Sequence, residues 1–141
     1  MHICTFSNSN YMNWKLLFNL SLFGLAMAFA TVSLIPSKFE PIFWLLIFFT
    51  CSWFIVKKVN GRYFLHGFVL SLINCIYIVG AHVFFFHTYI ASHPEMAQMN
   101  SNLPLSTHPR LMMVIMGPVF GIFFGLIQGL IAYIMSKLVK K

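Results

Sequence analysis

The sequence predicts an all-α fold, an integral membrane bundle of four transmembrane helices with both termini in the cytoplasm. Composition is the first indication, because 60% of the residues are hydrophobic and 8% are charged, whereas soluble domains are about one quarter charged. Four apolar runs reach or approach the length of a spanning helix, and most basic residues fall on one side of them. The length of 141 residues suits one membrane domain, 1–141. Nine dispersed basic residues do not form a phosphate-binding surface, so the expected partner is the lipid bilayer and not nucleic acid.

The apolar runs set the order of the elements. A spanning helix needs about 20 mostly apolar residues. The second run is short, but its flanking lysines can snorkel to the interface, and the third is long and should tilt or protrude. Pro36 and Pro41 bracket the first turn, and the Asn60-Gly61 pair marks the second. We therefore expect a flexible extension (1–13), spans over about 14–35, 41–57, 63–91 and 110–136, and an outer loop over 92–109.

The distribution of charge predicts the orientation. Threading four helices leaves Lys38 and Arg110 on one side, together with Glu40 and Glu95. Because positive charge favours the cytoplasmic side, we expect the other side to be cytoplasmic and the protein to be a multi-pass protein of a cell membrane, the bacterial inner membrane. That side carries both termini and seven basic residues: Lys15, Lys57, Lys58, Arg62, Lys137, Lys140 and Lys141.

The first apolar run also imitates a secretory signal. Lys15 precedes a stretch that ends in Ala28-Phe29-Ala30, the A-x-A pattern of a cleavage site. Cleavage would leave three spans and an N-terminus outside. The apolar run continues to Ile35, which is span length, and this favours a retained helix.

Four glycines recur at every fourth residue of the last apolar run. On a helix they form one face, over which another helix can approach closely. The first span offers a complementary ridge in Gly24 and Ala28, so we expect these two helices to pack within one protomer. The alternative is that the glycines contact a second copy or another protein. The glycine face consists of Gly117, Gly121, Gly125 and Gly129.

No Asp, Glu, Lys or Arg lies inside a predicted span. Ion-coupled carriers and proton relays contain such groups, so a transport path is not marked. Small multidrug exporters need a carboxylate in the first span, and four-helix enzymes that handle glutathione or eicosanoids need an Arg, Asn and Glu pattern; neither is present. The intramembrane polar residues are instead expected to bridge helices, with a substrate path as the alternative. They include Asn19, Asn74, His82 and Gln128, of which Asn19 and Gln128 lie at similar depth.

Catalytic and cofactor chemistry is also unmarked. The sequence shows no nucleophile with its base, no metal set and no cofactor motif, so we assign no catalytic residue and no cofactor and expect a protein that is not an enzyme. Cys4, Cys51 and Cys75 form no CxxC pair, and the latter two lie in apolar runs, where a thiol packs as a small hydrophobe.

Histidine and methionine gather around the predicted outer loop. Ser92 and Glu95 have the spacing of a capping box, which predicts a short helix over 93–100. Imidazole and thioether ligands suit a soft metal such as copper. However, no HxxxH pair appears, and methionine at helical spacing usually packs. We therefore assign no metal, and keep as an alternative a soft-metal site built from His87, His93, His108, Met96 and Met99.

The plan of four helices with a lysine-rich C-terminus is similar to that of small uncharacterised four-helix proteins of the bacterial inner membrane. This resemblance is architectural and implies no activity. We expect a structural or accessory membrane protein that associates with itself or other membrane proteins through its glycine-rich last helix. The alternative is a protein that binds or transports a small ligand or soft metal at the outer His/Met cluster.

Overall fold

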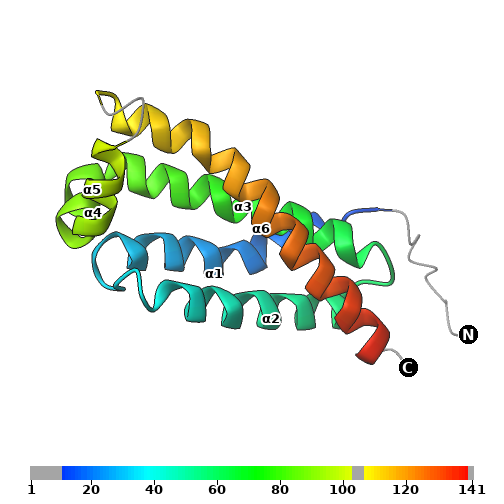
Figure 1. Ribbon diagram of the computed structural model, residues 1–141. Helices are drawn as coiled ribbons and strands as arrows, with labels where there is room; N and C mark the ends of the chain where they lie inside the picture. The colour runs from blue at the N-terminus through cyan, green and yellow to red at the C-terminus, as the bar shows by residue number, and fades with distance from the viewer. Residues whose placement is uncertain (1–10, 103–106, 140–141) are drawn as a thin grey trace, which may run out of the picture.

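A computed structural model describes residues 11–102 and 107–139, and every regular element in these ranges is a helix (Figure 1). Most of the expected extension (1–13) lies outside the described residues. The helices are α1 (Trp14–Ser33), α2 (Glu40–Lys58), α3 (Tyr63–Phe84), α4 (Phe86–Ser92), α5 (Pro94–Ser101) and α6 (Pro109–Val139).

Four of these helices, α1, α2, α3 and α6, are long and apolar enough to cross a membrane, which confirms the predicted all-α class and number of spans. Their ends follow local sequence signals. The Asn13 side chain accepts a hydrogen bond from the Leu16 N–H and caps α1, and Pro41 lies in the first turn of α2, where a missing N–H costs nothing. At 31 residues, α6 is about 46 Å long and exceeds the hydrocarbon thickness of about 30 Å.

The expected third span (63–91) is not one helix in the structure. The helix ends at Phe84, and a turn at Phe85 starts the short helix α4 in a new direction. No proline or glycine lies at this break. Contacts with α1 accompany it instead, because the Phe85 ring packs edge-on against Phe29 at 6.1 Å between centroids. The remainder of the predicted span therefore becomes part of a cap over one end of the bundle.

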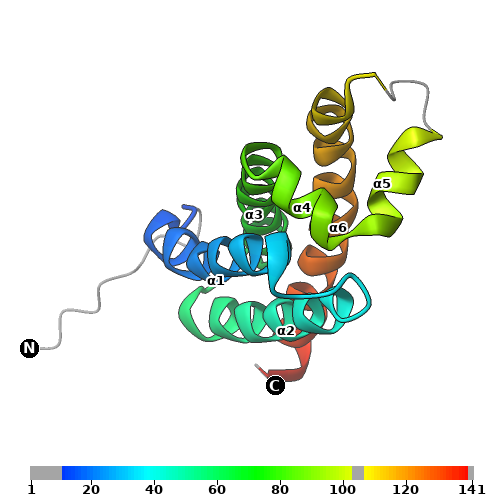
Figure 2. The same ribbon diagram turned by 90° about the vertical axis from the view of Figure 1, so that its left-hand side faces the viewer.

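Helix α3 lies at the centre of the packing. It contacts α6 along most of its length and α1 to a lesser extent, while α2 packs mainly on α6 (Figure 1). One end of the bundle, here called the cap end, carries the 34–39 turn, α4 and α5, which fold across it (Figure 2). The opposite end is called the basic end, because five of the seven described Lys and Arg residues belong to the helix ends and the turn there: Lys15, Lys57, Lys58, Arg62 and Lys137.

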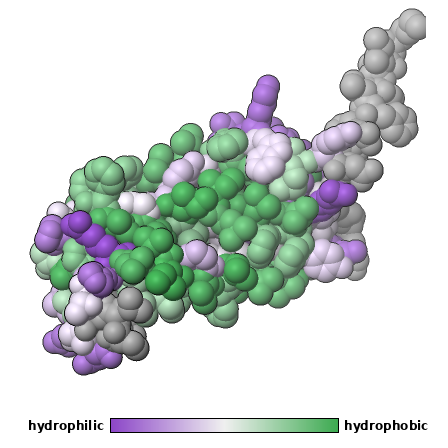
Figure 3. All heavy atoms as spheres, turned by 90° about the horizontal axis from the view of Figure 1, so that it is seen from above, coloured by the Kyte–Doolittle hydropathy of each residue, from purple (hydrophilic) through white to green (hydrophobic). Residues whose placement is uncertain are grey.

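The surface between these two ends is apolar. Figure 3 shows a continuous hydrophobic band flanked by hydrophilic residues at both ends. Large side chains such as Phe49 of α2 and Phe123 of α6 are more than half exposed, although they are hydrophobic. At the basic end, Lys57 lies over the Trp53 ring at 5.1 Å, and Lys137 lies over Tyr133 at 5.5 Å. An apolar belt with basic and aromatic residues at its margin is the surface of a multi-pass membrane protein.

Candidate functional site

The most developed polar cluster lies under the cap and is built on three stacked rings. The rings of His82 (α3) and Tyr89 (α4) stack at 4.1 Å between centroids, and those of Tyr89 and His93 at 4.5 Å. We call these three residues the ring stack. Tyr89 and His93 are almost completely buried. The stack joins the end of α3 to the junction between α4 and α5.

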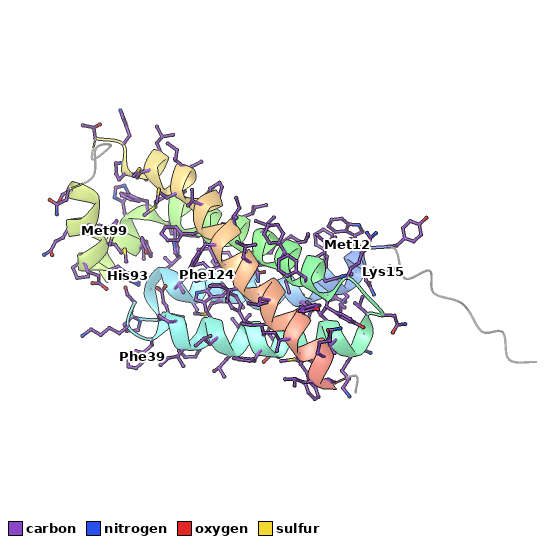
Figure 4. All side chains as sticks on the ribbon, turned by 45° about the vertical axis from the view of Figure 1, so that its right-hand side comes forward. Met12, Lys15, Phe39, His93, Met99 and Phe124 are labelled. Atoms are coloured by element: carbon purple, nitrogen blue, oxygen red, sulfur yellow. The ribbon has the colours of Figure 1, made fainter. Side chains whose placement is uncertain are left out.

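His93 connects the cap to the turn between α1 and α2. Its Nδ1 lies 3.0 Å from the Tyr89 carbonyl oxygen, and its Nε2 lies 3.3 Å from the Ile35 carbonyl oxygen. Nε2 is also 3.3 Å from Glu40 Oε1, a contact at ion-pair distance without the alignment of a good hydrogen bond. Figure 4 shows His93 at the cap end, far from Lys15 at the basic end.

Two buried histidines each join separate elements through both ring nitrogens. The nitrogens of His93 face two backbone carbonyls, and the Glu40 carboxyl lies beside Nε2. In His66 of α3, Nδ1 lies 2.9 Å from the Arg62 carbonyl oxygen, and Nε2 accepts the Asn13 N–H at 3.1 Å. His93 thus connects the cap to the α1–α2 turn, and His66 connects α3 to the start of α1.

Further polar groups surround the ring stack. The Ser37 hydroxyl, followed by the backbone N–H of Glu95 itself, lowers the pKa of the Glu95 carboxyl, and His93 and Lys38 add to this effect. Burial, reinforced by the two carboxylates, raises the pKa of Tyr89 to about 12, so its phenol stays neutral.

His82 anchors the other end of the stack to α1. Its Nε2 lies 3.0 Å from the Thr31 hydroxyl, which is itself 3.1 Å from the Ala28 carbonyl. If the Thr31 hydroxyl donates its proton to the Ala28 carbonyl, its oxygen accepts a hydrogen bond from His82 Nε2–H. The described cluster thus supplies hydrogen bonds and one close His93–Glu40 contact between α1, α2, α3 and the cap, and it leaves no free ring nitrogen on His93 for a metal or a substrate.

The residues of the proposed soft-metal site are not brought together. His87 and His108 line one hollow of about 580 Å³, but His93 is buried elsewhere and fully engaged. Met99 is 56% exposed. Within the described residues, no three His, Cys, Asp or Glu side chains approach closely enough to hold a metal ion. The full lining of the hollow is Phe86, His87, Thr107, His108, Pro109, Arg110 and Leu111.

The predicted helix near the outer loop is present as α5, but its cap differs from expectation. The carbonyl of His93, not of Ser92, accepts the first backbone hydrogen bonds, from Met96 at 3.0 Å and Ala97 at 3.3 Å. Ser92 instead ends α4. His93 therefore serves both as the start of α5 and as the connection to α1 and α2.

The glycine face of α6 is buried against α3, and the expected partner, α1, is wrong. A Cβ at Gly121 would lie 2.9 Å from Cys75 Sγ, and one at Gly125 would lie 2.9 Å from the Phe68 ring. Gly117 faces Val79, and Gly129 faces the Phe64 backbone. The ridge of α1 also packs on α3, since Gly24 faces Asn74 and Ala28 clusters with Ala81. Helix α3 thus packs against the small-residue faces of both α6 and α1.

The intramembrane polar residues fall into two groups. Asn74 and Gln128 are fully buried, whereas Asn19 is exposed on α1. Asn19 and Gln128 therefore do not meet, although they lie at similar depth. His82 joins the ring stack described above. None of the four amide atoms of Asn74 and Gln128 has a hydrogen-bond partner among the described residues.

Sequence reasoning did not assign roles to several residues of the cap cluster. Thr31 and Tyr89 belong to no motif, and Glu40 enters the sequence analysis only through its charge. The signal available for Glu40 was its rarity, because the chain contains two acidic residues in all. Tyr89 and His93 have helical i, i+4 spacing, but the break after α3 was needed to place them over α1.

Comparisons of this chain with protein-family models, with curated proteins and with solved structures give no match. What the described residues establish is architecture alone: four helices that are long and apolar enough to cross a membrane.

Proposed function

We propose that the protein is a small accessory membrane protein that associates, through its spanning helices, with another copy of itself or with other membrane proteins. The observation that supports this proposal is the exposure of Asn19 on the apolar exterior of α1. Its amide makes no hydrogen bond within the described part of the chain and lies about 8 Å into the helix from Trp14. Water is not available at this depth to satisfy it, so a second helix is the natural source of a partner.

The neighbours of Asn19 suit a helix–helix contact. Ala26 and Ser33 follow it at intervals of seven residues, and both are exposed. Residues seven apart lie on nearly the same face of a helix, so Asn19 begins a line of short side chains along α1, with the larger exposed Leu22 and Phe23 beside it. The glycine-rich face of α6 is already covered by α3. We therefore assign the glycines to packing within the protomer and place association on α1.

The basic end is proposed to be cytoplasmic, in the bacterial inner membrane or an equivalent cell membrane, because positive charge favours that side. The test compares Lys38→Cys at the cap end with Lys57→Cys at the basic end, in a chain whose own cysteines are replaced. A maleimide that does not cross membranes should label Lys38→Cys in intact cells and Lys57→Cys only after permeabilisation. The reverse pattern would show that the orientation is inverted.

We also propose that the protein is not an enzyme, since the cap cluster uses its polar groups for structural contacts. A turnover that disappears in Glu95→Ala or His93→Ala, while the fold is kept, would contradict this. The soft-metal alternative has no supporting geometry, because its histidines lie in separate places.

The association is tested by cross-linking in native membranes, followed by mass spectrometry of the purified protein. Asn19→Leu should weaken the cross-linked species at least severalfold, whereas Phe49→Leu, an apolar change at an exposed position of α2, should leave it unchanged. A cross-link between identical chains identifies a second copy, and a different chain in fixed ratio identifies another partner. The proposal fails if the wild-type protein is monomeric without a partner, or if Asn19→Leu has no effect.

A further inference from the structure

We propose that the centre of the bundle contains a polar site that binds water molecules, formed around the side chains of Gln128, Asn74 and Ser52. All three are at most 2% exposed. The amide nitrogen and oxygen of Gln128 and Asn74 and the hydroxyl of Ser52 have no hydrogen-bond partner among the described residues. A buried polar group without a partner is strongly disfavoured in a membrane interior, so these groups call for a ligand.

Contacts between the helices put these groups at neighbouring levels of the bundle. The rings of Phe48 (α2) and Phe124 (α6) contact each other at 6.3 Å between centroids, and one turn further along each of these parallel helices lie Ser52 and Gln128. On α3, Gly67 contacts the backbone of Gln128, and Asn74 lies two turns further toward the cap end.

Buried serines of α1, α2 and α3 follow members of one buried cluster in the sequence. Leu20, Cys51 and Leu70 belong to one buried cluster, and each is followed in the sequence by a buried serine. The region therefore contains polar groups from all four spanning helices. The three serines are Ser21, Ser52 and Ser71.

The chemistry of the unpaired atoms selects the ligand. Each amide presents both a donor and an acceptor, and the serine hydroxyl can act as either. A cation would leave the two amide nitrogens unsatisfied, and an anion would leave the oxygens unsatisfied. No described Asp, Glu, Lys or Arg lies at this level to neutralise an ion. A small neutral molecule that donates and accepts hydrogen bonds satisfies both kinds of atom, and water is the smallest.

Glycines of neighbouring helices lie beside Asn74 and Gln128. A Cβ at Gly24 would overlap the Asn74 amide, and one at Gly67 would meet the backbone of Gln128. The buried serines add hydroxyl groups to this part of the interior. Internal waters typically occupy such polar places and bind about three protein groups each.

Nuclear magnetic resonance of the intact protein in detergent micelles tests the proposal. The probe is water itself, detected as cross-relaxation to the side-chain NH₂ groups of Gln128 and Asn74, whose signals are identified by their loss in Gln128→Met and Asn74→Leu. We expect water cross-peaks at both groups in the wild-type protein. The same two variants should also unfold at a lower denaturant midpoint, because they remove the groups that the bound water satisfies.

A matched control is Ile76→Leu, a change on the lipid-facing side of α3, which should leave the midpoint unchanged. The proposal is overturned if the side-chain NH₂ groups show no cross-peak with water, or if Gln128→Met and Asn74→Leu raise the midpoint. Cross-relaxation directly between the two amides without water would also overturn it, because the groups would then satisfy each other.

Discussion

The contact between α3 and α6 makes a sharp prediction about single methyl groups. At the crossing near Gly67 and Gly129, the two backbones touch: a Cβ at Gly129 would lie 2.8 Å from the Phe64 carbonyl oxygen, and one at Gly67 would lie 2.8 Å from that of Gln128. A backbone oxygen cannot rotate away as a side chain can. Ordinary contact begins at 3.4 Å, so the helices must separate by the difference between 3.4 and 2.8 Å, about 0.6 Å.

The same helices provide a control. A Cβ at Gly80 of α3 would meet nothing within 4 Å. Gly80→Ala should therefore stabilise the protein by about 0.5–1 kcal/mol, because alanine is the better helix former. Gly67→Ala and Gly129→Ala gain the same propensity but add overpacking of about 1–3 kcal/mol. Relative to Gly80→Ala, each should lower the free energy of unfolding by about 1–3 kcal/mol.

Reversible unfolding in mixed micelles with increasing sodium dodecyl sulfate measures these differences. The double variant Gly67→Ala/Gly129→Ala should cost less than the sum of the single variants, because the first methyl group already separates the helices. Gly117→Ala, which meets the Val79 side chain, should cost less than Gly129→Ala. If Gly67→Ala and Gly129→Ala behave like Gly80→Ala, the inferred backbone contact is wrong.

Three further predictions concern the cap. His93→Ala should destabilise the cap by about 1–3 kcal/mol, measured as faster hydrogen exchange in α4 and α5, because it removes two hydrogen bonds between the buried ring and backbone carbonyls; unchanged exchange would refute the role of His93. Thr31→Val should cost about 1 kcal/mol and Thr31→Ser much less, because only valine removes the hydroxyl that contacts His82; equal unfolding midpoints would exclude this bond. The pKa of Glu95 is lowered, so its contribution is present above the ordinary value of 4.5 and is lost as pH falls through the lower folded pKa. Exchange in α5 should therefore rise on acidification below about pH 4.5, and Glu95→Gln should remove the part of this rise that depends on Glu95; a wild-type pH profile in that variant would contradict the assignment.

The spans were predictable because their signal is local. Each long helix corresponds to an apolar run whose length matches the hydrocarbon core, and the structure places α1 at Trp14–Ser33, close to the predicted 14–35. The fourth span likewise begins at Pro109, where 110 was predicted. Hydrophobicity and length require no knowledge of which helices touch.

The end of the third span was not predictable for the opposite reason. The apolar run continues through Phe85, and neither glycine nor proline marks a break. At this turn, side chains contact other helices: Phe85, just before α4, packs on Phe29 of α1, and Tyr89 of α4 stacks on His82 of α3. The periodicity of hydrophobic residues along a sequence does not predict contacts of this kind between distant residues. The same applies to His93, which was grouped with possible metal ligands because its carbonyl partners are not encoded as a motif.

The identity of the helix that contacts the glycine face illustrates what a small-residue stripe can and cannot reveal. Glycines spaced by four predict that a helix will be approached closely, but α1 and α3 both offer small residues for the approach. The structure favours α3, which precedes α6 in the chain and places Gly67 opposite Gly129. Where glycines face each other, both backbones can come into contact, whereas Gly24 of α1 is already occupied by the Asn74 side chain. A glycine on each helix at the crossing point, rather than the longest stripe on either one, therefore identifies the pair. This leaves α1 with an outward face that begins at Asn19, and that face is where the search for a partner should begin.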